Sequence, residues 1–138
     1  MTDINIKENI ISELERSDKA LEPADLLFEN GFLSDAISML YYFLAHSIRT
    51  LLLTKGFEPK SHEGVLRVFG LHFIKEGIFG ARSSHIFAKL MKYREEADYN
   101  PGYSFTKEDF IEFRKEAKDL SDKIKGYLKE RSYIAQRS

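Results

Sequence analysis

The chain has 138 residues, of which 43% are hydrophobic and 31% are charged, with a formal net charge of −1. This length and balance suit one compact domain and exclude a disordered chain. A nearly neutral chain has no overall basic field to attract nucleic acid or anionic membranes, and the absence of cysteine excludes disulfides, thiol catalysis and thiolate metal sites.

The N-terminal stretch is charged from its start and lacks the apolar core of a signal peptide. No apolar run approaches the roughly 20 residues that a membrane span needs. We therefore expect a cytoplasmic protein that does not contact a membrane.

Apolar residues repeat with helical spacing almost throughout the chain. The first segment runs from about residue 4 to 30 and ends at Asn30-Gly31, a typical C-terminal stop. Pro23 lies inside this segment and predicts a kink or a short break just before it. The second segment, from about 33 to 55, is apolar on most sides, which places it at the centre of a helical bundle.

The remaining chain predicts three more helices. The third, from about 62 to 75, has Ser61 as a candidate N-cap. The fourth, from about 82 to 98, carries a core stripe with 4-3-4 spacing. The fifth starts at Thr106, where Asp109 completes a weak capping box, and it has the clearest amphipathic pattern of the chain.

No segment alternates with period two for long enough to predict a strand. The expected fold is therefore all-α, an up-and-down bundle of four to five helices in a single domain over residues 1–138. The ordered core is expected to span about residues 4–130, with fraying beyond it.

Polar side chains gather at the end of the fourth segment. Arg94 and Asp98 are four residues apart and share one helical face, and Tyr99 lies where Asn-Pro-Gly stops the helix. One interpretation is a surface ion pair worth about 0.3–0.5 kcal/mol, in which Arg94 compensates for a carboxylate at a helix C-terminus. The other is a contact to a ligand or RNA, and the two roles are compatible.

Four further residues are candidates for the same groove. Adjacent positions of a helix point about 100° apart, so one of Tyr41 and Tyr42 is expected in the core and the other at a groove or a dimer seam, and we take Tyr42 as the groove candidate. Lys60 and His62 flank a helix N-terminus that could hold a phosphate, although plain capping and an ordinary first turn explain this stretch equally. Arg49 is expected to line the groove, to face solvent or to lie in an interface.

We expect no metal and no cofactor. The four histidines lie on different segments without an i,i+4 pair, whereas zinc needs three or four convergent ligands. Nucleophilic triads, glycine-rich phosphate loops and paired catalytic carboxylates are also absent from the sequence.

Several motifs in order resemble the small prokaryotic HEPN-domain proteins, over roughly residues 29–127. These are Asp35-Ala36-Ile37-Ser38 with Tyr41-Tyr42 and Arg49, then Lys60-Ser61-His62-Glu63-Gly64-Val65, then Phe69 with His72-Phe73, and finally Arg94-Glu95-Glu96-Ala97-Asp98-Tyr99.

The resemblance implies a helical bundle that forms a homodimer and often sits beside a minimal nucleotidyltransferase as a toxin–antitoxin pair. In the active branch of this family an arginine, followed after four to six residues by a histidine, cuts RNA without a metal. The window after Arg94 holds Tyr99 and no histidine, and a phenol with a pKa near 10 is a poor general base at neutral pH. Arg67 and His72 satisfy the spacing, but they lie in the third segment, earlier than the family places its motif.

The first hypothesis is therefore a HEPN-like module without catalysis, or weakly active, that binds a nucleotide, RNA or a nucleotidyltransferase partner. Arg94, Asp98 and Tyr99 would form the floor of its groove. The first alternative is a metal-independent endoribonuclease in which Arg94 stabilises phosphate charge and Tyr99, or a histidine from elsewhere, moves the proton. The second is a helical scaffold without a ligand. Surplus apolar surface on the second and fifth segments is expected to form the homodimer.

Overall fold

The computed structural model describes residues 3–100 and 102–135. Within these ranges every regular element is helical, so the all-α prediction is confirmed. The elements in chain order are α1 (Asp3–Glu29), α2 (Leu33–Thr54), α3 (His62–Phe69), the π-helix η1 (Gly70–Ile74), α4 (Ala81–Tyr99) and α5 (Lys107–Glu130).

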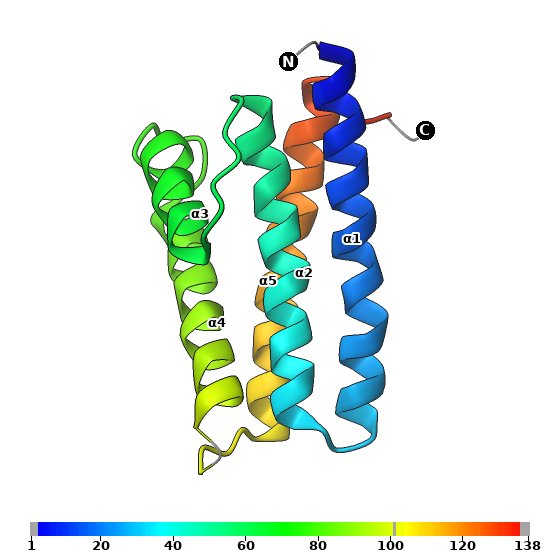
Figure 1. Cartoon of the computed structure of the whole chain (residues 1–138), viewed down its shortest axis with the longest axis vertical. Coiled ribbons are helices and arrows are strands. Elements are labelled where there is room, and N and C mark those ends of the chain that lie inside the picture. The colour runs from blue at the N-terminus through cyan, green and yellow to red at the C-terminus, as the bar shows by residue number, and fades with distance from the viewer. Residues whose placement is uncertain (1–2, 101, 136–138) are drawn as a thin grey trace.

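The four long helices run up and down along the long axis of the molecule (Figure 1). α2 lies in the centre and contacts α1, α4, α5 and α3. The short α3 covers one end of α4, and the rest of α4 packs against α2 and α5 (Figure 1). The helix end that carries the candidate site is therefore flanked by α2 on one side and by the start of α3 on another.

α2 supplies the core because it is apolar around most of its circumference. By length and composition α2 could also cross a membrane, but 78% of its most apolar window is buried inside the bundle. The expectation that no apolar run reaches such a length is thus wrong for Leu33–Thr54. Burial in the bundle accounts for the hydrophobicity of α2.

α1 passes through Pro23 without a break. A proline inside a helix removes one N–H donor and crowds the carbonyl one turn earlier. Pro23 lies on the exposed side of α1, where water can hydrogen-bond the freed carbonyl. The predicted short break before Pro23 is therefore wrong, and the alternative of a kink stays a prediction.

The third predicted segment is one α-helix followed by a wider π-turn, a feature that is frequent near functional sites. The Lys55 ammonium donates to the His72 carbonyl at 2.7 Å and to Glu76 at 2.8 Å, while the His72 ring stacks on Phe57 at 4.4 Å. These contacts fasten the π-turn to the end of α2. His72 is thereby committed to packing, and Arg67 is exposed.

The predicted helix ends are largely confirmed. The Ser61 hydroxyl accepts from the Gly64 amide at 2.9 Å, and Thr106 and Asp109 form both bonds of a capping box. Gly31 adopts a φ of 84°, which favours glycine, directly after α1. α5 ends at Glu130 as expected, and of the residues expected to fray, 136–138 lie outside the described residues.

A chain of buried hydroxyls joins three helices at the centre of the bundle. The Ser17 hydroxyl of α1 donates to the Phe43 carbonyl at 2.7 Å and lies 2.8 Å from the Ser47 hydroxyl of α2. Ser47 in turn lies 2.9 Å from the Ser121 hydroxyl of α5. Because buried polar groups are costly without partners, this chain fixes how α1 and α5 align against α2.

Candidate functional site

Arg94 is the centre of the site and lies in the last turns of α4. Its side chain is 15% exposed, and its Nε lies 3.3 Å from Asp98 Oδ2. The guanidinium carbon lies 5.5 Å from the ring centroid of Tyr41 and 5.6 Å from that of Tyr42. Cation–π contact with two rings of α2 therefore holds the guanidinium in place.

The electrostatic surroundings keep Arg94 charged. Burial alone lowers the pKa of Arg94, but a hydrogen bond to Tyr42 and the Asp98 carboxylate raise that pKa above its ordinary value. The Arg94 Nε is the one buried side-chain nitrogen or oxygen in the described part of the chain without a hydrogen-bond partner, because Asp98 lies close but out of line. The guanidinium of Arg94 is thus held in position while its Nε–H has no hydrogen-bond acceptor.

Asp98 links α4 to α2. Its Oδ1 accepts a hydrogen bond from the Ser38 hydroxyl at 3.2 Å, while its Oδ2 faces Arg94. The pair is therefore more than a surface i,i+4 ion pair. Ser38, Asp98 and Arg94 together position the last turn of α4 against α2.

Tyr41 and His62 form a second polar contact beneath the groove. The Tyr41 hydroxyl lies 2.5 Å from His62 Nδ1, and the Tyr41 ring is fully buried against Phe87. Burial raises the pKa of Tyr41, although the charges of Arg94 and Arg49 oppose the change. The phenol thus stays protonated and either donates to Nδ1 or accepts from it.

The surroundings of His62 favour its neutral form. Burial lowers the pKa of His62, and the positive charges of Arg94 and Arg49 lower it further, against the smaller opposing effect of Glu63 and Glu95. Because Nδ1 is engaged by Tyr41, Nε2 is the nitrogen available to a ligand.

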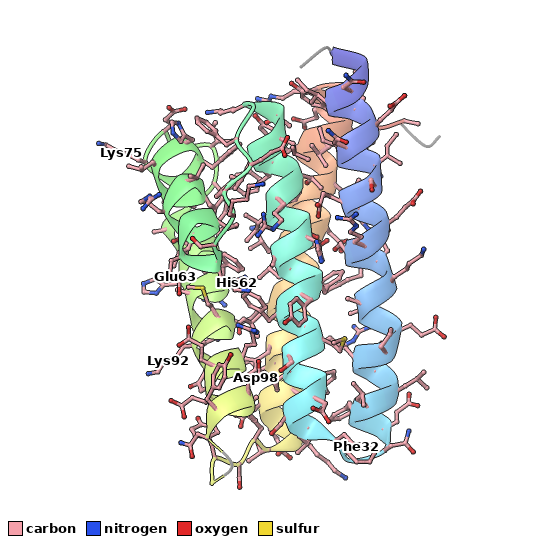
Figure 2. All side chains as sticks on the ribbon, viewed as in Figure 1. Phe32, His62, Glu63, Lys75, Lys92 and Asp98 are labelled. Atoms are coloured by element: carbon pink, nitrogen blue, oxygen red, sulfur yellow. The ribbon has the colours of Figure 1, made fainter. Side chains whose placement is uncertain are left out.

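An open groove of about 620 Å³ brings these side chains together at the surface. Tyr99 stands at its edge and is 77% exposed, whereas Arg94 lies at its floor. In Figure 2, His62 and Asp98 lie on the side that faces α2, and Glu63 points away from the bundle. The lining residues are His62, Glu63, Arg94, Glu95, Glu96, Tyr99 and Asn100.

The structure places the other predicted residues differently. Tyr42 lies beneath the groove against Arg94. Arg49 donates to the Pro59 carbonyl at 2.8 Å and lines a separate pocket between α1, α2 and the loop after α2. Lys60 is exposed and does not line the groove. Arg49 lies two turns after Tyr42 on the same side of α2, so it is displaced along the helix axis and reaches the loop that carries Pro59.

Two features of the groove were not predicted from the sequence. One is the Tyr41–His62 contact, which depends on how α3 packs on α2. The other is the acidic rim of Glu63, Glu95 and Glu96 around a single arginine. Glu95 and Glu96 follow Arg94 directly in the sequence, and this adjacency could have predicted carboxylates beside the arginine. The described residues contain no group of three histidine or carboxylate side chains arranged to hold a metal.

We predict that His62 makes the protein less stable in mild acid. The unfolded imidazole titrates near about 6.5 and the folded one lower, so between these values the unfolded chain binds more protons. The free energy of unfolding should then fall as the pH drops below about 6.5 and level off below the folded pKa. Urea unfolding at several pH values, and an NMR titration of the imidazole, measure both effects.

The control for this prediction is His62→Gln, which cannot titrate. It should lose less stability than the wild type between pH 7.5 and pH 5.5. A wild-type His62 that titrates at or above about 6.5 would contradict the prediction.

Comparison with known proteins agrees with the family resemblance seen in the sequence motifs. Residues 12–127 match the model of the HEPN domain. The chain is 38% identical over 126 residues to a Methanocaldococcus jannaschii protein named "Putative toxin MJ0605", covering 91% of this chain and 93% of that relative. A second protein of that organism, "Putative toxin MJ0142", is 29% identical over 91% of this chain and 86% of its own length. A "UPF0332 protein" of Thermotoga maritima is 29% identical over 92% of this chain and 97% of its own. With the all-α bundle and a family match over most of its length, the chain belongs to the HEPN domain family.

Proposed function

We propose that the chain is the helical half of a cytoplasmic toxin–antitoxin pair and that its groove binds a single nucleotide. One observation carries the proposal: Arg94, His62 and Tyr99, from two helices, line the same open groove. The names of two relatives support a toxin-like role. The proposal favours binding over catalysis because Tyr99 replaces the histidine of the active branch.

The charge of the groove determines the size of the ligand. Arg94 offers a guanidinium fork to one phosphate, and the exposed Tyr99 ring offers a face on which a base can stack. The carboxylates of Glu63, Glu95 and Glu96 can accept hydrogen bonds from ribose hydroxyls and exocyclic amines, but they repel further phosphates. One nucleotide therefore fits this groove better than a long RNA strand, which needs several cations along its path.

The same groove is where a nucleotidyltransferase antitoxin would act. Tyr99 and the carboxylate rim are exposed at the end of α4, within reach of a protein partner. Covering this end of α4 would mask Arg94 and Tyr99 together. The partner would thus compete with the nucleotide for one surface.

Calorimetric titration with AMP and with adenosine tests the proposal. We expect AMP to bind and adenosine to bind about tenfold or more weakly, because only AMP offers a phosphate to Arg94. Tyr99→Ala should weaken AMP binding by about 1–3 kcal/mol through lost stacking. The control Arg82→Ala alters a side chain that is 80% exposed near the start of α4, and it should leave AMP binding unchanged. Equal binding of both ligands, or no heat with either, would overturn the proposal and favour a scaffold without a ligand.

A metal-independent endoribonuclease is the second candidate, because the structure brings His62 beside Arg94. When Nδ1–H donates to the Tyr41 oxygen, Nε2 carries a lone pair that can take the proton of a ribose 2′-hydroxyl. That oxygen attacks the adjacent phosphorus, the 5′-oxygen leaves with a proton from Tyr99 or water, and Arg94 stabilises the phosphate charge.

RNA incubated with the protein and a chelator tests this second candidate. Cleavage should be lost in His62→Ala and retained in His72→Ala, since His72 packs on Phe57 away from the groove. RNA that stays intact with wild-type protein from pH 5 to pH 9 would eliminate it.

A further inference from the structure

The pocket that Arg49 lines is separate from the groove at the end of α4. It has a volume of about 240 Å³ and shares no lining residue with the groove. We call it the loop pocket, because α1, α2 and the loop after α2 each contribute to it. Its lining residues are Asn9, Ser12, Glu13 and Arg16 of α1, Arg49 and Leu53 of α2, and Phe57, Glu58 and Pro59 of the loop.

Arg49 is the half-buried cation of the loop pocket. Its guanidinium donates to the Pro59 carbonyl at 2.8 Å, a bond that uses one of the five N–H donors. Arg49 forms no ion pair with any residue in the described ranges 3–100 and 102–135. A guanidinium that is partly removed from water normally has an anionic partner. Arg49 is therefore suited to bind an anionic group of a ligand.

The half-buried carboxylate of the loop pocket, Glu13, is already engaged. Its Oε2 lies 2.7 Å from His46 Nδ1, and its Oε1 lies 3.3 Å from Arg16 Nη1. Burial raises the pKa of Glu13, but the bond to His46 and the nearby positive charges bring that pKa below its ordinary value. Glu13 therefore stays ionised, and its charge is balanced by Arg16 within the protein.

Glu58 is the second charge of the loop pocket without a partner. It is exposed in the loop after α2 and forms no ion pair with Arg49 or with any other described residue. Arg49 and Glu58 thus line one pocket with opposite charges that do not contact each other. A purely anionic ligand would be attracted by Arg49 and repelled by Glu58, whereas a ligand that carries both charges is attracted by both.

We propose that the loop pocket binds a small zwitterion, an α-amino acid with an apolar side chain. The carboxylate of the ligand accepts hydrogen bonds from Arg49, its ammonium group donates to Glu58, and its side chain packs on Leu53 and Phe57. The volume of about 240 Å³ lies below the roughly 300–1,000 Å³ of pockets for drug-sized ligands. This size favours an amino acid over a nucleotide.

The loop that closes this pocket leads directly to the groove. Pro59 accepts the bond from Arg49, and Ser61, two residues later, caps α3. The next residue, His62, lines the groove. A ligand carboxylate at Arg49 offsets one of the positive charges that lower the pKa of His62, so that pKa should rise when the loop pocket is occupied. A protonated His62 attracts phosphate, so each ligand should favour binding of the other.

An NMR titration with L-leucine tests the loop pocket. Leucine should shift the amide signals of residues 57–59 and of the pocket residues on α1. Leucine amide, which lacks the carboxylate, and 4-methylpentanoate, which lacks the ammonium group, should each bind about tenfold or more weakly. No shift up to about 10 mM leucine would overturn the proposal, and equal binding of 4-methylpentanoate would overturn the zwitterion as the ligand class.

Two variants assign the binding to the named charges. Glu58→Gln should weaken leucine binding about tenfold or more and leave the fold intact, because Glu58 is exposed. Arg49→Met should weaken it at least as much, and Arg49→Lys, which keeps the charge without the fork, should restore part of it. Glu8→Gln, an exposed residue of α1 outside the pocket, and Arg114→Met are the matched controls and should bind leucine like the wild type. Unchanged binding in Glu58→Gln and Arg49→Met would overturn the proposal.

The outcomes separate this proposal from the proposed function. Leucine binding without AMP binding supports the loop pocket and overturns the nucleotide site alone, whereas AMP binding without leucine binding overturns the loop pocket alone. The link between the two sites rests on the proposed function, while the loop pocket does not. An NMR titration of the His62 imidazole should give a higher pKa in saturating leucine than without it, and an unchanged or lower pKa would overturn the link.

Discussion

Phe87→Ala is expected to lower the free energy of unfolding by about 3–5 kcal/mol, the usual cost of truncating a buried phenylalanine. Phe87 is 0% exposed, and its ring stacks on Tyr41 with 5.6 Å between centroids. The loss combines the transfer free energy of the ring with a cavity beside Tyr41. Urea unfolding measures it directly, and the melting temperature should fall by about 10–20 °C.

Two comparisons make this prediction specific. Ile111→Ala removes a side chain that is 58% exposed, and it should change stability by no more than about 0.5 kcal/mol. Phe87→Ala should also disturb the groove, because Phe87 supports Tyr41 and Tyr41 contacts both Arg94 and His62. A loss below about 1 kcal/mol would contradict the tight packing of α4 on α2.

Arg94→Met is expected to abolish most nucleotide binding while the fold survives. A charge-assisted contact to phosphate is worth about 1.5–3 kcal/mol, so the dissociation constant for AMP should rise about 10–100-fold. Methionine retains an apolar stem between Tyr41 and Tyr42. Removing one partner of an ion pair is costly when the remaining charge is buried, but the Asp98 side chain is 34% exposed, so the fold should survive. Asp98 keeps its bond from Ser38 and partial contact with water.

Arg114→Met is the matched control for this variant. Arg114 donates to both carboxylate oxygens of Asp25, at 2.7 and 2.9 Å, and joins α5 to α1; neither residue lines the groove. It should cost some stability and leave AMP binding unchanged. If Arg94→Met binds AMP like the wild type, Arg94 is structural and the nucleotide site is wrong; calorimetry and urea unfolding of both variants decide this.

The sequence predicted the fold well because helix spacing and helix ends are local properties. The capping box at Thr106 and Asp109 and the N-cap at Ser61 depend on residues three apart, and the structure shows both. The predicted short break at Pro23 was wrong because the tertiary context of a helix can override a local helix-breaking preference.

The candidate site was predictable only where it is local. Arg94 and Asp98 share one turn of α4, so their proximity follows from spacing alone. His62 meets Tyr41 only after α3 folds back on α2. The two residues lie on different helices, so their spacing in the sequence does not predict the contact. The separation of Arg49 from the groove likewise depends on the loop that carries Pro59.

The hydroxyl chain of Ser17, Ser47 and Ser121 has a consequence for how this bundle can move. Sliding α1 or α5 by one turn along α2 would strand these groups in hydrocarbon, so intermediate positions are uphill in both directions. The three helices therefore act as a fixed frame. Mobility that accompanies ligand capture should then be confined to α3 and the end of α4, and slow amide exchange along α1, α2 and α5 would be its signature.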